Sequence, residues 1–362
     1  MEKSSPLFIS VIIPVRNESK HIVEVLDRLL EQDYPTDRFE ILVLDGRSED
    51  DTREIVAKYG EKHSNVRILD NPKRLSSGAR NIGIQNACGD VVLLVDGHCI
   101  IDSKFILQKT DEAFRESGAD CLGRPQPLEL SHAVPMQLAI AAARRSPIGH
   151  HPDSFIYAGK ACFSPAISVA VAYRKEVFEK IGVFDERFDA AEDCELNHRI
   201  DKTGLKCFFT PDIAVRYVPR ATLGGLAKQL IRYGIGRVRL SRKHPETFSW
   251  KSFLPTAFVG GIFAGIILCV CLLAFLITGI ATPADCCTVS VFGFLELGCV
   301  IFAAVMMLYA AIVIFESIRI AIQNRRLYYC FYLPAVFATI HLSSGYGLFK
   351  EIFFPRAKFD TH

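Results

Sequence analysis

The chain has 362 residues, enough for one large domain and a smaller one. Its 42 Lys and Arg balance 40 Asp and Glu, so it lacks the basic excess of a typical nucleic-acid-binding protein, and we expect no nucleic-acid partner. The charge is unevenly spread: all but seven of the basic residues and all but five of the acidic residues precede residue 251. This asymmetry predicts a polar N-terminal domain followed by an apolar C-terminal part.

Four short apolar runs in the N-terminal half predict strands buried on both faces, because their apolar residues are continuous rather than alternating. The runs cover residues 8–14, 39–45, 65–69 and 90–96, and amphipathic helical patterns separate them. This alternation predicts an α/β domain with a mostly parallel sheet, in which ligands bind beyond the carboxyl ends of the strands. The stretch "PVRNES" after the first run contains no glycine, which argues against a dinucleotide-binding turn.

Three apolar stretches, at about 253–281, 290–315 and 327–349, are each long enough to cross a bilayer as a helix. The third is the weakest, because it contains Pro334, His341 and two serines. The first connecting loop lacks Lys and Arg whereas the second has three Arg, which predicts the first outside and the second inside. Three crossings would then place the basic tail outside, so either this bias fails or the third segment is re-entrant.

The boundaries expected from these patterns are a cytosolic domain at 1–220, an amphipathic interfacial segment at 221–250, and a membrane domain at 251–362 with about three spans. The first ten residues lack the apolar core of a secretory signal, so the first domain is expected to remain in the cytosol.

Each candidate polar residue at the predicted strand ends and helix starts has two possible roles. Asp45 either accepts a hydrogen bond from a nucleobase or caps the following helix. Asp96 and His98 either share one metal ion, since alternate residues of an extended segment share a face, or form an ordinary Asp-Gly turn. In "DAAEDCELNHRI", Asp193 is either a catalytic base or an acid that complements a helix dipole. Spacing alone leaves each pair open.

The segment "LAKQLIRYGIGRVRLSRKHPE" precedes the first apolar stretch and is rich in Lys and Arg. It predicts an amphipathic helix on anionic lipid headgroups. Gln229, Arg232 and Tyr233 have the spacing i, i+3 and i+4 and would share one side of that helix, where they alternatively face the active site.

Seven stretches follow one another along the chain: "VIIPVRNES", "LVLDGRSEDDT", "ARNIGI", "VDGH", "IGVFDERF", "AEDCELNHRI" and "QLIRYGIGR". In this order they resemble the motifs of the family-two glycosyltransferases with the GT-A fold. The resemblance covers roughly residues 8–245. Within the family, the "RYGxGR" stretch and the trailing apolar segments look most like membrane-anchored enzymes of succinoglycan-type exopolysaccharide synthesis.

The resemblance implies a role for individual residues. It places Pro14, Val15, Glu18, Asp45, Arg80 and Asp96 in the nucleotide-sugar pocket, Asp96 and His98 at a divalent cation, Asp193 as catalytic base, and Glu192, Gln229, Arg232 and Tyr233 at the acceptor. His98 stands where the family usually has a second aspartate, and Tyr233 where it usually has tryptophan. An imidazole ligand suits Mn²⁺ better than Mg²⁺, which prefers oxygen.

The function implied is an inverting, metal-dependent transfer of a sugar from a nucleoside-diphosphate sugar, expected to be UDP-linked, to a hydroxyl. The apolar segments favour an acceptor saccharide linked to polyprenyl diphosphate, since a membrane-tethered site meets such a lipid at raised local concentration. Three alternatives remain: a polyprenyl-phosphate glycosyltransferase that charges the carrier itself, a processive synthase, and a non-catalytic sugar-nucleotide-binding membrane protein.

Overall fold

The computed structural model describes residues 5–149, 159–278 and 286–355. The chain divides into two compact units. The first comprises Met1–Ala133 and Pro152–Pro219, and the second comprises Val134–His151 and Arg220–His362. The break at Pro219 lies next to the boundary expected at residue 220, whereas the transfer of Val134–His151 to the second unit was not anticipated. The C-terminal tail beyond residue 355, whose side of the membrane the sequence left open, lies outside the described residues.

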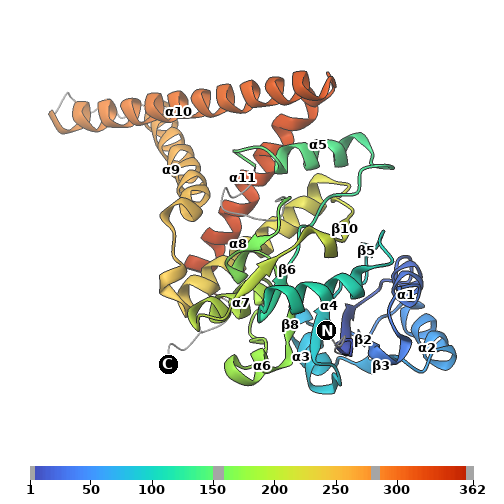
Figure 1. Ribbon diagram of the computed structural model, residues 1–362. Helices are drawn as coiled ribbons and strands as arrows, with labels where there is room; N and C mark the ends of the chain where they lie inside the picture. The colour runs from blue at the N-terminus through green and yellow to red at the C-terminus, as the bar shows by residue number, and fades with distance from the viewer. Residues whose placement is uncertain (1–4, 150–158, 279–285, 356–362) are drawn as a thin grey trace. The chain divides into compact units, whose positions relative to one another are not determined.

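The first unit contains an eight-stranded sheet with strand order β3-β2-β1-β4-β8-β6-β9-β7 (Figure 1). Only β8 and β7 run antiparallel to their neighbours in it, so the expected α/β fold with a mostly parallel sheet is confirmed. The strands are β1 (Ile9–Val15), β2 (Phe39–Asp45), β3 (Val66–Asp70), β4 (Val91–Leu94), β6 (Cys121–Gly123), β7 (Cys162–Phe163), β8 (Ala170–Arg174) and β9 (Cys207–Phe209). A separate two-stranded sheet pairs β5 (Cys99–Ile100) with β10 (Arg216–Tyr217).

Helices cover both faces of the main sheet, as the continuous apolar strands predicted. Successive strand residues point to opposite faces, so Ile13 and Val43 join one core and Ile12 and Leu42 the other. On the first face lie α1 (Ile22–Leu30), α2 (Thr52–Lys62) and α4 (Ile106–Ser117); on the second lie α3 (Ser76–Asn86), α6 (Lys175–Ile181) and α7 (Glu192–Lys202). Short 3-10 turns occupy Thr36–Arg38, Ala166–Ser168 and Pro211–Ile213.

The chain reverses its direction of winding between β1 and β4. It places β2 and β3 successively on one side of β1 and then returns to place β4 on the other side. Such a switch point is where open α/β sheets bind ligands, because the loops after the two central strands diverge there. The loops that follow β1 and β4 therefore line the same position.

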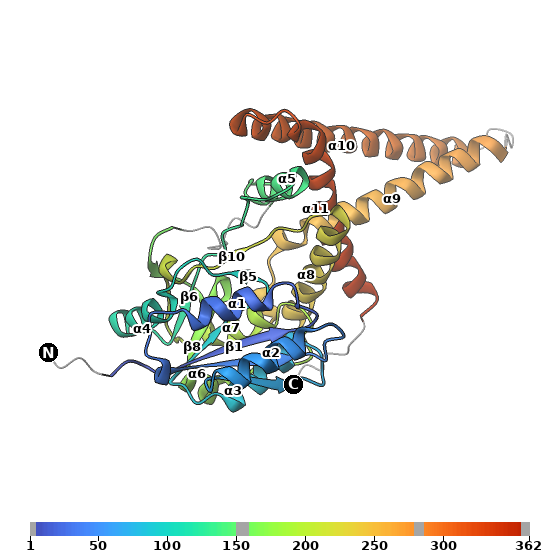
Figure 2. The ribbon, with the colours of Figure 1, turned by 90° about the vertical axis from the view of Figure 1, so that its right-hand side faces the viewer.

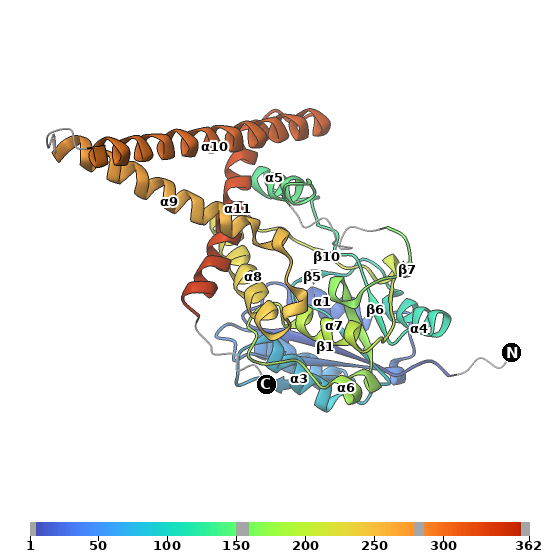
Figure 3. The same ribbon diagram turned by 90° about the vertical axis from the view of Figure 1, so that its left-hand side faces the viewer.

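The second unit is helical. Its elements are α5 (Pro135–Arg144), α8 (Leu223–Lys243), α9 (Trp250–Thr278), α10 (Cys286–Asn324) and α11 (Tyr329–Phe353), with a 3-10 turn at Pro245–Thr247. Its most extensive helix contact joins α8 and α11, which lie side by side (Figures 1 and 3). The two helices approach closely at glycines, because a Cβ on Gly234 would meet the backbone of Ser344 and Leu348 at 2.7 and 2.9 Å. Gly347 lies even more tightly against the Ile231 carbonyl.

Among the described residues, two helices are long and apolar enough to cross a membrane. They cover Phe253–Ile277 and Val291–Asn324, and 6% of the most apolar window of each is buried. α11 does not meet the same criterion. The number of spans, expected to be about three, therefore stays a prediction.

Candidate active site

Loops at the carboxyl edge of the sheet contain strained backbone. Asn17 follows β1, Arg47 follows β2 and Arg74 follows β3, each with a positive φ between 56° and 59°. Ala191, directly before α7, has a φ of 62°. A left-handed non-glycine residue costs roughly 1–2 kcal/mol, and such strain concentrates at binding sites. Among these residues only Asn17 has a residue type typical of left-handed positions, whereas Arg and Ala are not.

Asp45 ends β2 and is fully buried. Its Oδ1 accepts a hydrogen bond from the Ser48 backbone N–H at 3.2 Å, and its Oδ2 pairs with Arg53 Nη1 at 3.2 Å. The carboxylate therefore organises the loop after β2. Because the Arg53 side chain is more than half exposed, it can move away from Asp45 when a ligand arrives. The nucleobase role of Asp45 stays a prediction.

Asp96 lies beyond the end of β4 and is held by Tyr217, a residue that the sequence reasoning missed. The Tyr217 hydroxyl donates to Asp96 Oδ2 at 2.8 Å. Burial and the Asp96 carboxylate raise the pKa of Tyr217 well above its usual value, so the phenol keeps its proton. Although burial opposes ionisation of Asp96, Arg80, His98 and the Tyr217 hydroxyl outweigh it and hold the pKa of the Asp96 carboxyl below its usual range. Asp96 is thus an anion with one oxygen directed to Tyr217.

His98 and Glu18 bring the loops after β4 and β1 together, as the switch point requires. His98 Nδ1 lies 3.1 Å from Glu18 Oε1, and the His98 ring packs edge-on against Tyr217. Gly97 between the two candidate ligands fits closely over Val15, because a Cβ there would come within 2.7 Å of Val15 Cγ1. Pro14 and Val15 are the last two residues of β1, directly before the loop that carries Glu18.

The residues around Asp96 fit a divalent cation. If Nδ1 of His98 carries the proton and donates it to Glu18, Nε2 presents the lone pair that a metal requires, a carboxylate–histidine arrangement common at metal sites. Asp96 supplies a carboxylate oxygen beside it. No group of three ligand atoms surrounds this pair in the part of the chain that the structure describes. The remaining coordination positions would fall to ligand oxygens and water.

Arg80, on α3, links Asp96 to the Glu192–Asp193 pair. Its Nη1 donates to Glu192 Oε1 at 2.8 Å, and its Nη2 lies 4.0 Å from Asp96 Oδ1. The guanidinium is mostly buried, packs over the Phe184 ring at 5.3 Å, and leaves Nε without a hydrogen-bond partner. The structure therefore brings Glu192, expected at the acceptor, together with Arg80 and Asp96, both expected in the nucleotide-sugar pocket.

The acidic residues that open α7 divide into different environments. Glu192 is buried against Arg80, and Glu195 forms a bidentate pair with Arg199, which also donates to the carbonyls of Ile181 and Val183. Asp193 is exposed, and its Oδ1 accepts a hydrogen bond from the backbone N–H of Cys194 at 2.8 Å. Only Asp193 therefore keeps a carboxylate oxygen turned to solvent, which is what a base for an incoming substrate requires.

Asn81 holds the loop that leads to Asp193. Its Nδ2 donates to the Phe184 carbonyl at 2.9 Å and to Glu186 at 3.0 Å, and its Oδ1 accepts from the Phe184 N–H at 2.9 Å. Ser77 adds a bond to the Phe188 carbonyl at 3.2 Å. These contacts connect "ARNIGI" to "IGVFDERF", two motifs whose order the sequence revealed but whose connection it did not.

Arg124, directly after β6, was not among the residues expected from the sequence, and neither was Asn81. Arg124 is 2% exposed, and its Nη2 donates to the Leu94 carbonyl at 3.1 Å. Its Nε and Nη1 are buried without a hydrogen-bond partner. A buried guanidinium with unused donors is costly, so it indicates a site for an anion or water near Asp96, whose pKa Arg124 also lowers.

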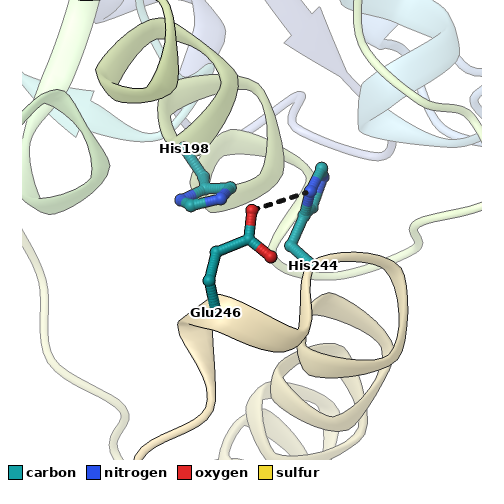
Figure 4. Close-up of side chains that lie close together, drawn as sticks. All are labelled: His198, His244 and Glu246. Atoms are coloured by element: carbon teal, nitrogen blue, oxygen red, sulfur yellow. Dashed lines mark ion pairs between the residues drawn. The ribbon is translucent and has the colours of Figure 1, made fainter.

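Gln229, Arg232 and Tyr233 lie on α8, in the second unit. The Gln229 amide donates to the Tyr233 hydroxyl at 2.9 Å, and Tyr233 is half exposed. Both therefore lie on one side of the helix, as their spacing predicted, and Arg232 is exposed between them. At the C-terminal end of α8, Figure 4 shows His244 with its Nδ1 4.0 Å from Glu246 Oε1; His198, also drawn, belongs to α7 of the first unit.

We predict that Asn81→Ala destabilises the first unit by about 2–4 kcal/mol, because it leaves the buried Phe184 N–H and carbonyl without partners. Chemical denaturation, followed by far-UV circular dichroism, measures the decrease in the free energy of unfolding. The matched control is Asn86→Ala on the same helix, whose exposed side chain bonds only the Ile82 carbonyl and whose removal should change stability by less than about 0.5 kcal/mol. Equal losses for the two variants would contradict the role assigned to Asn81.

Two family models match the chain. The model described as "Glycosyl transferase family 2" matches residues 10–182, which include every candidate residue on the β1, β2 and β4 loops. The model described as "Glycosyl transferase family group 2" matches residues 145–318 and includes Glu192, Asp193 and the α8 residues.

Relatives and a solved structure match over most of the chain. A dolichyl N-acetyl-alpha-D-glucosaminyl phosphate 3-beta-D-2,3-diacetamido-2,3-dideoxy-beta-D-glucuronosyltransferase of Methanococcus voltae is 27% identical over 95% of this chain and 97% of that protein. The succinoglycan biosynthesis protein ExoA of Rhizobium meliloti is 28% identical over 68% of this chain and 74% of that protein. The mannosyltransferase PcManGT from Pyrobaculum calidifontis, solved in complex with GDP-Man and Mn²⁺, shares the fold with a TM-score of 0.55 and 18% identity over 94% of this chain and 88% of that chain. The chain belongs to the family 2 glycosyltransferases, as its order of motifs indicated.

Proposed function

We propose that the protein is an inverting glycosyltransferase that moves a sugar from a nucleoside-diphosphate sugar to a lipid-linked saccharide. The nucleotide that we propose for the donor is UDP. The observation that supports this function most is the chain of contacts from Asp96 through Arg80 to Glu192. It joins the end of β4, where a donor diphosphate would bind, to the helix that presents Asp193. A donor and an acceptor hydroxyl could therefore meet within one continuous polar site.

In this proposal Asp193 accepts the proton of the acceptor hydroxyl as that oxygen attacks the anomeric carbon. The bond to the donor diphosphate breaks at the same time, so the configuration inverts and an α-linked donor gives a β-linked product. Glu192, neutralised by Arg80, positions the neighbouring backbone rather than taking the proton, because its carboxylate is already paired and buried. General-base catalysis of this kind contributes roughly 10²- to 10⁴-fold to the rate.

Positive charge around Asp96 supports departure of the diphosphate. Asp96 and His98 would hold Mn²⁺ or Mg²⁺, which would supply Lewis-acid stabilisation of that leaving group. Arg80 and Arg124 add fixed guanidinium charge in the same region, and Glu18 fixes the His98 ring through Nδ1. Asp45, Pro14 and Val15 at the ends of β2 and β1 are proposed to hold the nucleoside.

The lipid-linked acceptor is supported by the apolar helices and by the names of two relatives. The relative of Methanococcus voltae carries dolichyl N-acetyl-alpha-D-glucosaminyl phosphate in its name, and that of Rhizobium meliloti is a succinoglycan biosynthesis protein. Helices α9 and α10 would anchor the enzyme in the membrane that carries such acceptors. The first unit is then proposed to lie on the cytosolic side, with the sugar nucleotide.

We expect Asp193→Asn to lower turnover at least 10²-fold while leaving UDP affinity within about twofold, since the amide cannot take a proton but keeps its shape. Transfer from radiolabelled nucleotide sugar and UDP binding by calorimetry measure the two properties. Asp189→Asn, an exposed acid in the same loop, is the matched control and should retain turnover. If the Asp193→Asn protein still fulfilled its function in cells, a non-catalytic sugar-nucleotide-binding protein would be favoured instead.

We expect the wild-type enzyme to prefer Mn²⁺ to Mg²⁺ and His98→Asp to shift this preference toward Mg²⁺, because an all-oxygen pair suits the harder cation. The ratio of initial rates in the two metals after EDTA treatment measures the preference. If the ratio is the same in both proteins, His98 is not a ligand and Asp96 alone belongs to the site.

The acceptor class is tested by incubating membranes that contain the protein with labelled nucleotide sugars and three acceptor types. We expect product on saccharides linked to polyprenyl phosphate or diphosphate, and none on free sugars. Product on bare polyprenyl phosphate alone would indicate an enzyme that charges the carrier. Product on free sugars alone would contradict the lipid-linked acceptor.

A further inference from the structure

Helices α9 and α10 form an antiparallel hairpin within the second unit. Their contacts step evenly along both helices: Phe258 packs on Tyr309, Gly265 on Phe302, Leu268 on Gly298 and Phe275 on Phe292. As the residue number rises in α9 it falls in α10. Figure 2 shows the two helices as arms that meet at the C-terminal end of α9 and the N-terminal end of α10.

The part of the hairpin between the Phe258–Tyr309 contact and its tip is long enough to cross a bilayer. From Phe258 to Thr278, α9 extends about 30 Å at 1.5 Å per residue, which equals the thickness of the hydrocarbon core. The outer surface of this part is apolar and exposed, with Ile267, Leu276 and Phe294 among its most exposed side chains. A lipid environment is the partner that fits such a surface.

The third helix, α11, contacts this hairpin near its open end. Gly345 lies against Pro255 and Val259, Phe349 packs on Phe263, and His341 bonds the Tyr309 hydroxyl at 3.0 Å. Figure 3 shows α11 crossing α9 steeply rather than running along it. α11 therefore meets α9 in its first half and does not accompany the hairpin to its tip.

On its other sides α11 binds α8 and the segment around α5 through polar groups. Arg239 of α8 pairs with Glu351 at 3.0 Å, and both side chains are less than a tenth exposed. Arg242 donates to the carbonyls of Glu351 and Ile352 at 2.8 and 3.1 Å and so caps the end of α11. His341 Nε2 lies 2.8 Å from the Ile148 carbonyl. A buried charge pair is costly in lipid but compatible with a body at the membrane surface.

The exposed surfaces of α8 and α11 suit that location. α8 exposes Lys228, Arg232 and Arg237, which anionic headgroups attract. α11 exposes Phe331, Tyr346 and Phe353, and aromatic side chains of this kind are frequent at the membrane–water interface.

We infer that the chain crosses the bilayer twice, through α9 and α10, and that α11 is an interfacial helix which packs with α8 and α5 on the side of the first unit. The C-terminus then lies on the same side as the catalytic unit. This arrangement also places Arg325 and Arg326, which follow α10, together with the basic tail on one side, as the distribution of positive charge in membrane proteins favours. The inference rests on the membrane insertion proposed above and not on the transfer chemistry.

Reporter fusions to the full chain in a bacterial inner membrane test this topology. An N-terminal fluorescent protein marks the cytosolic side, and alkaline phosphatase, active only outside, is placed either after Thr282 between α9 and α10 or after His362. We expect phosphatase activity at the loop position at least tenfold above that at the C-terminus, and a fluorescent protein moved to the C-terminus should remain as bright as at the N-terminus.

An active C-terminal phosphatase would overturn the inference, because it requires a third crossing. Inactivity at both phosphatase positions would overturn it as well, together with the proposed membrane insertion, since no segment would then leave the cytosol. Loss of transferase activity with the expected reporter pattern would leave the topology standing and count against the proposed function alone. Leu333→Arg, in the buried core of α11, serves as a fold-disrupting control that should lower the yield of all fusions equally.

Discussion

The buried Arg80 guanidinium is the interaction on which the arrangement of the site depends. It lies between two carboxylates from different parts of the fold, Glu192 at the start of α7 and Asp96 after β4. Without its charge, the ionised carboxylates would repel one another at short range, and a buried partner left unpaired costs about 3–5 kcal/mol. Arg80 therefore sets the position of the helix that carries Asp193 relative to the end of β4. Its Nε remains available for a further acceptor.

Much of the fold follows from local patterns. The four strands of the N-terminal half agree with their apolar runs to within a residue or two at most ends, because a strand buried on both faces needs continuous apolar sequence. The reversal between β1 and β4 then brings Glu18 and His98 together without any local signal between them. The excursion of α5 into the second unit was not predictable, since its apolar face gains a partner only when α11 is present.

The site was predictable in its motifs but not in its connections. Asp96 and Asp193 are candidates from short patterns and Arg80 from the family resemblance, and their roles stay predictions, whereas no pattern marks Tyr217, Asn81 or Arg124. Tyr217 reaches Asp96 across 121 residues of sequence, and its position is set by pairing with Cys99 and by backbone hydrogen bonds with Pro127 and Glu129. Patterns report what neighbours along the chain share, so a contact made by a single side chain across the fold leaves no periodicity to detect.

The two faces of α8 explain why "RYGIGR" combines glycine with polar residues. Gly234 and Arg239 face α11, where the close backbone contact and the buried ion pair lock the helix in the second unit. Gln229 and Tyr233 interact on its more exposed side. In the proposed function, α8 would contribute Gln229 and Tyr233 to acceptor recognition. Because α8 packs tightly on α11, those side chains would stay at a fixed height above the lipid, which a lipid-linked substrate requires and a soluble one would not.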